Sequence, residues 1–199
     1  MRATAWSMAR RWLTAVSLAL CAASLGYGEI EKIGTPCEQG ICLSWWPKLP
    51  AVVGWHHERG ASLQYGANAL APDGFTFSNA EVVMYAAALY KPRMPATKSV
   101  DTLIADDTQK FLAQDSSIVV AEVGSLTSGD GQRMRSFSFF PRSKGTWERV
   151  TYGEEDDFFL VFTISSRSLQ AYKLRQAEYE ALVARYRSKP SDTAAPSAK

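Results

Sequence analysis

The chain has 199 residues, of which 46% are hydrophobic and 12% aromatic, and its formal net charge is +2. This length supports one globular domain with short appendages, and the apolar fraction excludes disorder over the whole chain. The near balance of 22 basic and 20 acidic residues excludes a basic nucleic-acid-binding arm and an acidic tail. Composition alone names neither a reaction nor a partner.

The first 23 residues have the pattern of a secretory signal peptide. Arg2, Arg10 and Arg11 precede an uncharged, mostly apolar stretch at 12–23 that ends in small residues. As a helix this stretch would rise only about 18 Å, which is short for a permanent membrane anchor. An uncleaved anchor and a buried core helix are the alternatives, and cleavage as late as Gly28 also fits the pattern.

Removal of this segment changes both the charge and the expected location of the protein. Its three Arg residues leave with it, so 19 basic residues remain against 20 acidic ones and the net charge becomes about −1. A nearly neutral chain gives no support to nucleic-acid binding. The sequence therefore predicts a periplasmic or secreted protein with no stable membrane span after cleavage.

Residues 24–50 form a lead-in that holds the two remaining cysteines, Cys37 and Cys42. An even number of cysteines in an exported chain predicts a disulfide, and Gly40 allows the short loop between them to turn. A redox-active pair and free thiols are the alternatives, while a metal site would need further ligands that the mature chain does not supply as cysteine. Residues 43–50 are expected to be irregular because they contain two prolines.

Two adjacent tryptophans, Trp45 and Trp46, follow the cysteine loop. Aromatic side chains on a loop can anchor a partner protein, but they can equally cover one end of a hydrophobic core. The sequence does not separate these two interpretations. Trp45 and Trp46 are therefore candidate partner contacts.

The chain from 51 to 188 is expected to form a single α+β domain. Its first half predicts strands, separated by glycine-containing turns, at 52–58, 62–65, 75–78 and 81–90. A helix is predicted over 99–114, because its apolar residues recur every three or four positions and Ser99 is a suitable N-cap.

The second half predicts an antiparallel meander followed by a long helix. Short turns separate the four predicted strands, which lie at 117–123, 132–140, 146–153 and 158–165. The last strand is apolar on both alternating faces, so helices are expected on both sides of the sheet. The closing helix is predicted over 168–187, with an apolar stripe formed by Tyr172, Tyr179, Leu182, Val183 and Tyr186. Residues 189–199 are predicted to be a disordered tail.

Chemistry-bearing residues are sparse. His56 and His57 are adjacent on a predicted strand, where neighbouring side chains point to opposite faces and cannot comfortably share one metal ion. The acidic run at 154–157 is interpreted as a solvated turn, with a cation site as the alternative, because it lacks the length and order of a calcium-binding loop. No nucleophile elbow, H-E-x-x-H motif or phosphate-binding loop is present.

The segment at 152–162, YGEEDDFFLVF, followed by the helix from Ala171 to Tyr186, resembles the closing part of bacterial envelope proteins with the PsbP-like fold. The resemblance implies a three-layer α/β/α sandwich around a mainly antiparallel sheet. It also implies an accessory or binding role, because members of this class act mostly as adaptors or as parts of larger assemblies. No functional residue of the family maps onto this chain.

These observations favour an exported, soluble, non-enzymatic binding or accessory protein of the bacterial cell envelope, with a protein partner and no cofactor. One alternative hypothesis is a small-molecule hydrolase that uses His56 or His57. Another is an accessory protein that binds Ca²⁺ or Mn²⁺ at the acidic turn.

Overall fold

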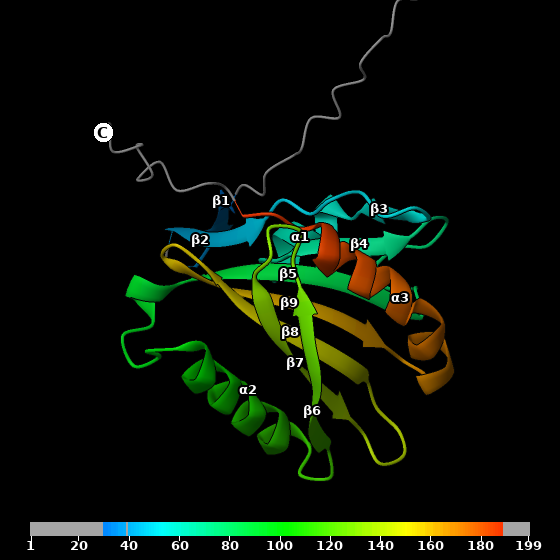
Figure 1. Ribbon diagram of the computed structural model, residues 1–199. Helices are drawn as coiled ribbons and strands as arrows, with labels where there is room; N and C mark the ends of the chain where they lie inside the picture. The colour runs from blue at the N-terminus through cyan, green and yellow to red at the C-terminus, as the bar shows by residue number, and fades with distance from the viewer. Residues whose placement is uncertain (1–29, 39, 189–199) are drawn as a thin grey trace, which may run out of the picture.

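A seven-stranded sheet, a separate two-stranded hairpin and three α-helices make up the computed structural model, which describes residues 30–38 and 40–188 (Figure 1). The predicted signal peptide at 1–23 and the predicted tail at 189–199 lie outside the described residues. The strands are β1 (Ile30–Cys37), β2 (Gly40–Pro47), β3 (Trp55–His57), β4 (Asn68–Pro72), β5 (Val82–Tyr90), β6 (Val119–Thr127), β7 (Arg133–Phe140), β8 (Trp147–Glu155) and β9 (Phe158–Ser166). The helices are α1 (Arg59–Tyr65), α2 (Val100–Gln114) and α3 (Leu169–Arg185), with a short 3₁₀ turn, η1, at Lys91–Arg93.

The strands of the large sheet lie in the order β3-β4-β5-β9-β8-β7-β6, and every pair is antiparallel. The predicted four-strand meander is confirmed as β6 to β9. Strand β9 then pairs with β5 over nine residues, which places it in the centre of the sheet. This position explains its apolar sequence, because a central strand is covered on both faces.

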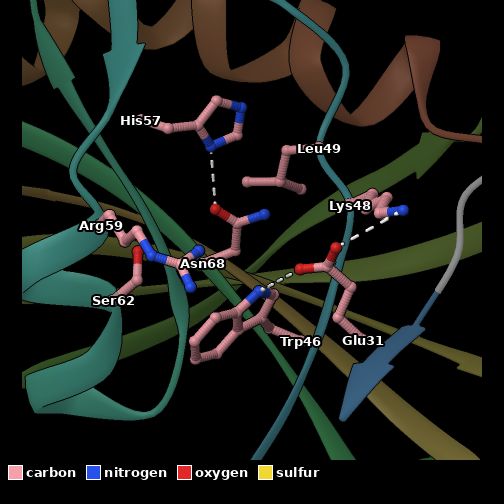
Figure 2. A pocket seen from close by; sticks show the side chains of 8 residues that line it. All are labelled: Glu31, Trp46, Lys48, Leu49, His57, Arg59, Ser62 and Asn68. Carbon is pink, nitrogen blue, oxygen red and sulfur yellow. Dashed lines mark hydrogen bonds and ion pairs between the residues drawn. The ribbon is translucent and has the colours of Figure 1, made fainter. Parts of the chain in front are cut away.

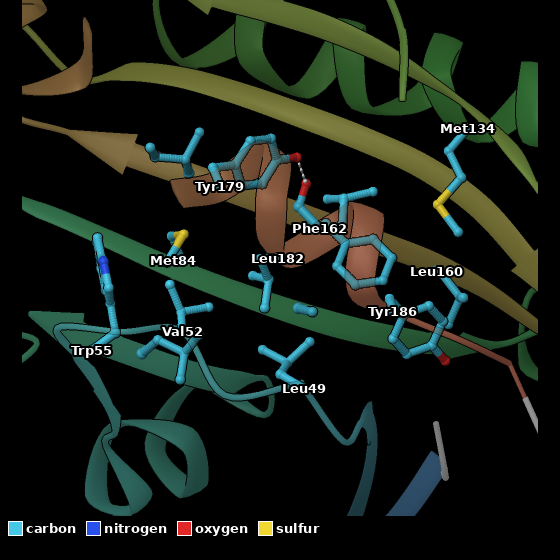
Figure 3. Close-up of a cluster of buried hydrophobic side chains, with 14 of the residues drawn as sticks. Leu49, Val52, Trp55, Met84, Met134, Leu160, Phe162, Tyr179, Leu182 and Tyr186 are labelled. Carbon is cyan, nitrogen blue, oxygen red and sulfur yellow. Dashed lines mark hydrogen bonds between the residues drawn. The ribbon is translucent and has the colours of Figure 1, made fainter. Parts of the chain in front are cut away.

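Helices α2 and α3 pack against opposite faces of this sheet. Leu160, Phe162 and Ile164 of β9 share a buried cluster with the predicted apolar stripe of α3 (Figure 3). Phe159, which points the other way, belongs to a second cluster with Leu103 of α2. The fold is therefore mixed α+β around a mainly antiparallel sheet, as the sequence predicted.

Both long helices begin where the sequence predicted. The Ser99 hydroxyl accepts a hydrogen bond from the Thr102 amide at 3.2 Å, and the Ser168 hydroxyl accepts one from the Ala171 amide at 3.1 Å. Each serine satisfies a backbone N–H that has no partner within its own helix. These side-chain caps explain why the helix starts could be located from the sequence.

The predictions for the segment at 62–78 were wrong. Residues 62–65 belong to helix α1, which ends at Gly66 in the left-handed conformation, with φ 66°. Residues 75–78 form a loop, and the missing strand is β4, at Asn68–Pro72. Four alternating residues are too few to distinguish a strand from one helical turn. Strand β4 is rich in alanine, and its burial comes from long-range pairing with β3 and β5.

The lead-in is also more regular than predicted. Instead of an irregular segment at 43–50, β1 and β2 form a hairpin paired from Ile30↔Pro47 to Cys37↔Gly40. Cys37 and Cys42 lie at disulfide distance, as predicted, with Cα atoms 5.8 Å apart. Pro47 closes β2 at its last position, where it interrupts no ladder. The hairpin contacts β5, while the predicted domain boundary at residue 51 stays a prediction.

On the face of the sheet beside α2, partial burial of Glu148 makes its ionised carboxylate unfavourable at neutral pH. Burial raises the pKa of Glu148, although a hydrogen bond from the Ser165 hydroxyl at 2.9 Å opposes this shift. A carboxyl group whose pKa is higher in the folded state binds its proton more tightly there. The contribution of Glu148 to stability therefore falls as the pH rises above the pKa of the unfolded chain.

We expect Glu148→Gln to raise the free energy of unfolding at pH 7 and to leave it unchanged near pH 3. Glutamine still accepts the Ser165 hydrogen bond but carries no charge to desolvate. Denaturant unfolding at both pH values measures the difference. Equal stability of the two proteins at pH 7 would contradict this account of Glu148.

Candidate functional site

A pocket of about 320 Å³ lies where the hairpin, β3, α1 and β4 meet (Figure 2). Its formation depends on long-range pairing: β4 brings Asn68 beside β5, and β3 places His57 opposite Leu70 of β4. The hairpin supplies the remaining wall. The side chains that line the pocket are Glu31, Trp46, Lys48, Leu49, His57, Arg59, Ser62 and Asn68.

The buried polar groups of this pocket already have partners within the protein. Asn68 is 7% exposed, and its Nδ2 donates to the Pro47 carbonyl at 2.9 Å. Ser62 is 3% exposed; its hydroxyl donates to the Glu58 carbonyl and accepts from the Ala69 amide, both at 2.9 Å. Buried polar groups that are fully paired hold their positions. The base of the pocket is therefore built in advance of any ligand.

The same hydrogen bonds assign the tautomer of His57. Because Asn68 Nδ2 donates to Pro47, Asn68 Oδ1 is the atom that faces His57 Nδ1, at 2.9 Å. An amide oxygen can only accept, so Nδ1 of His57 carries the proton. In the neutral imidazole, Nε2 then keeps a lone pair, and it has no hydrogen-bond partner among the residues that the structure describes.

The charged groups of the pocket are unequally paired. Glu31 accepts from Trp46 Nε1 at 3.3 Å and forms an ion pair with Lys48 at 3.4 Å. Arg59 also lines the pocket, yet its guanidinium has no ion-pair or hydrogen-bond partner within 30–38 and 40–188. In the part of the chain that the structure describes, the pocket thus combines a neutralised pair with one unpaired cation.

The two histidines are separated as strand geometry predicts. His56 Nε2 lies 2.9 Å from Glu58 Oε1, and His56 Nδ1 lies 3.4 Å from Asp73 Oδ1. His57 instead contacts Asn68 and lines the pocket. The two imidazoles do not meet at a common site.

The geometry does not connect His57 to a nucleophile. Ser62 lines the same pocket, but both of its hydroxyl hydrogen bonds go to backbone groups. Glu31 contacts Trp46 and Lys48, and the group that orients His57 is the Asn68 amide. A relay needs the nucleophile and the base within hydrogen-bond reach of each other. Hydrolysis by His57 stays a hypothesis that these contacts do not favour.

The tryptophans of the hairpin are packed rather than presented to solvent. Trp46 is 3% exposed, whereas Trp45 is half-buried and lies against Tyr90, with ring centroids 5.2 Å apart. The Arg93 guanidinium covers the Trp45 ring at 4.6 Å, and Arg93 also donates to the Leu43 carbonyl at 3.2 Å. These contacts favour the interpretation as a cover over the core. A role of Trp45 and Trp46 as partner contacts stays a prediction.

The acidic run at 154–157 is not a separate turn of four residues. Glu154 and Glu155 belong to β8, and only Asp156 and Asp157 form the turn to β9. Glu154 pairs with Lys91 at 2.7 Å, while Glu155 accepts a hydrogen bond from the Tyr186 hydroxyl. Successive strand residues point to opposite faces, so these carboxylates diverge. In the part of the chain that the structure describes, no group of three or more His, Cys, Asp or Glu side chains could hold a metal ion.

Sequence reasoning did not find Glu31, Arg59 or Asn68, which are central to the pocket. Each is a single polar residue that belongs to no recognisable sequence motif. The hairpin and β4 bring them together, and both of these elements were predicted wrongly from the sequence. Two candidates from the sequence line the pocket, His57 and Trp46. A correct assignment of β4 would have placed Asn68 beside His57.

The fold and the site together define a mixed α+β protein with a pre-built pocket beside its sheet, lined by apolar as well as polar and charged side chains. Comparison of the chain with models of known protein families and with curated protein sequences found no match. Among the helices at 30–38 and 40–188, none is both long and apolar enough to cross a bilayer.

Proposed function

We propose that this chain is an exported, non-enzymatic binding or accessory protein of the bacterial cell envelope, and that it engages a protein partner at the pocket of Figure 2. The observation that carries the proposal is the pairing within the pocket. Its buried polar groups are satisfied internally, whereas the Arg59 guanidinium has no partner among the residues that the structure describes. A pocket with a rigid floor and one unpaired charged group is suited to binding, because little free energy is lost in reorganising the protein when a ligand binds.

Export is supported by two independent features. The basic and apolar pattern of residues 1–23 is typical of a signal peptide, and Cys37 and Cys42 lie at disulfide distance. Disulfides persist in oxidising compartments such as the periplasm and the cell exterior. The packing of α2 and α3 on opposite faces of the sheet supports the proposed three-layer sandwich of the PsbP-like type.

A photo-cross-linking experiment in living cells tests the proposed function. A benzophenone amino acid at Lys48, whose side chain is 50% exposed at the pocket, is expected to give one discrete cross-linked protein. The matched control carries the same probe at Arg142, an exposed residue of the β7–β8 loop, which lies far from the hairpin in Figure 1.

The position of the cross-link decides the outcome. A partner captured from Lys48 and not from Arg142 supports binding at the pocket. The same adduct from both positions, or adducts from Arg142 alone, would contradict it. Absence of any adduct from Lys48 under native expression would remove the protein partner from the proposal.

A further inference from the structure

We infer that the pocket recognises a carboxylate group of a peptide ligand, held by the Arg59 guanidinium. This inference rests on the proposed function, because it names the chemistry of the partner at the same site. Arginine presents a planar fork of N–H donors that matches the two oxygens of a carboxylate. Arg59 is free to use this fork, since it has no partner among the described residues.

The charge of the pocket favours a monoanion. Lys48 and Glu31 neutralise each other across 3.4 Å, which leaves Arg59 as the single excess positive charge among the described residues that line the pocket. A phosphate group carries a charge of about −1.5 to −2 near neutral pH and would also meet the Glu31 carboxylate. A carboxylate carries one negative charge. The balance of charges therefore fits a carboxylate better than a phosphate.

His57 indicates a second feature of the ligand. With its proton on Nδ1, the neutral ring offers Nε2 as a hydrogen-bond acceptor, so a complementary ligand supplies a donor. In a peptide, a backbone N–H lies close to the carboxylate in both cases, whether the carboxylate is the end of the chain or belongs to an acidic side chain. The volume of about 320 Å³ lies at the small end of ligand pockets, which range from about 300 to 1,000 Å³, and suits a short piece of chain.

Four small probes distinguish the possible ligands. Each is titrated into the full exported chain, and binding is followed by two-dimensional ¹H–¹⁵N nuclear magnetic resonance. N-acetylglycine mimics a chain end, and the α-amide of N-acetylglutamate, in which only the side-chain carboxylate is free, mimics an acidic side chain. N-acetylglycinamide is the neutral control, and inorganic phosphate is the competing anion. We expect one of the two carboxylate probes to shift the side-chain signals of Asn68 and Arg59 in a saturable manner.

Variants of Arg59 test the assignment of the contact. Arg59→Gln is expected to weaken binding of the active probe by about tenfold to a hundredfold, which is the range for a charged hydrogen bond. Arg59→Lys keeps the charge without the fork, so a partial loss is expected. Arg142→Gln, which removes an exposed arginine outside the pocket, is the matched control and should bind like the unchanged protein.

Each outcome supports or overturns the inference. Binding of N-acetylglycine alone identifies a chain end, and binding of the glutamate probe alone identifies an acidic side chain. Equal binding of phosphate or of N-acetylglycinamide, or unchanged affinity in Arg59→Gln, would overturn carboxylate recognition. Absence of binding by every probe overturns it as well, and a cross-link from Lys48 that persists in that case would leave the proposed function standing.

Discussion

Replacement of Phe162 by alanine is expected to lower the free energy of unfolding by about 3–5 kcal/mol, the largest stability effect among the predictions made for this protein. Phe162 is fully buried in β9, and its ring packs edge-on against Tyr186 with centroids 5.1 Å apart. Figure 3 shows the side chain between the sheet and α3. The substitution leaves a cavity where the central strand packs against the C-terminal end of α3.

Thermal and denaturant unfolding measure this effect. At the usual dependence for a domain of this size, the melting temperature should fall by about 6–20 °C. Phe75→Ala is the matched control, because Phe75 is 53% exposed on a loop and should change stability by less than about 1 kcal/mol. Similar losses in the two variants would show that α3 does not pack on β9 as described.

Removal of Glu180 is expected to lower the free energy of unfolding by about 2–3 kcal/mol, because it leaves a buried guanidinium without its counter-charge. Arg149 of β8 is nearly inaccessible, and its Nη1 donates to Glu180 Oε1 of α3 at 2.6 Å. The Glu180 side chain is 40% exposed, so the effect falls below that of a fully buried pair. Urea unfolding of Glu180→Ala measures it.

The opposite substitution provides a sharp contrast. Arg149→Met replaces the buried cation with an apolar side chain of similar length, so the change in stability should be less than about 1 kcal/mol or favourable. Large losses in Arg149→Met and none in Glu180→Ala would contradict this account of the pair.

The pH dependence of the same pair has a defined sign. Burial opposes ionisation of Glu180, but hydrogen bonds from Gln176 and Arg149 lower its pKa below the model-compound value of 4.5. A carboxylate with a lowered folded-state pKa stabilises the protein above the unfolded pKa and loses that contribution as the pH falls. Glu180→Ala should therefore lose less stability than the unchanged protein between pH 5 and pH 3.

Local sequence signals predicted the elements whose structure depends on nearby residues. Ser99 and Ser168 cap their helices through hydrogen bonds that span three residues, and the stripe from Tyr172 to Tyr186 repeats with the helical period. The strands of the meander are joined by short turns, so their pairing is local as well. The sequence was sufficient for these parts because the interactions that fix them lie close together along the chain.

The pocket could not be predicted in the same way. Asn68 lies in an alanine-rich strand whose identity depends on pairing with Ala86, and the hairpin contributes Glu31 from a distant part of the chain. Such contacts need a register between segments far apart in sequence, and no local pattern encodes it.

The sequence by itself determined the mixed α+β class, the two long helices, the meander, the cysteine pair and the pattern of an export signal. Only the tertiary structure decided that residues 62–65 are helical, that 43–47 belong to a strand, and that His57, Arg59 and Asn68 share a pocket with the hairpin. The physical reason is the range of the interactions. Caps, turns and amphipathic stripes act within a few residues, whereas a pocket depends on the packing of separate segments.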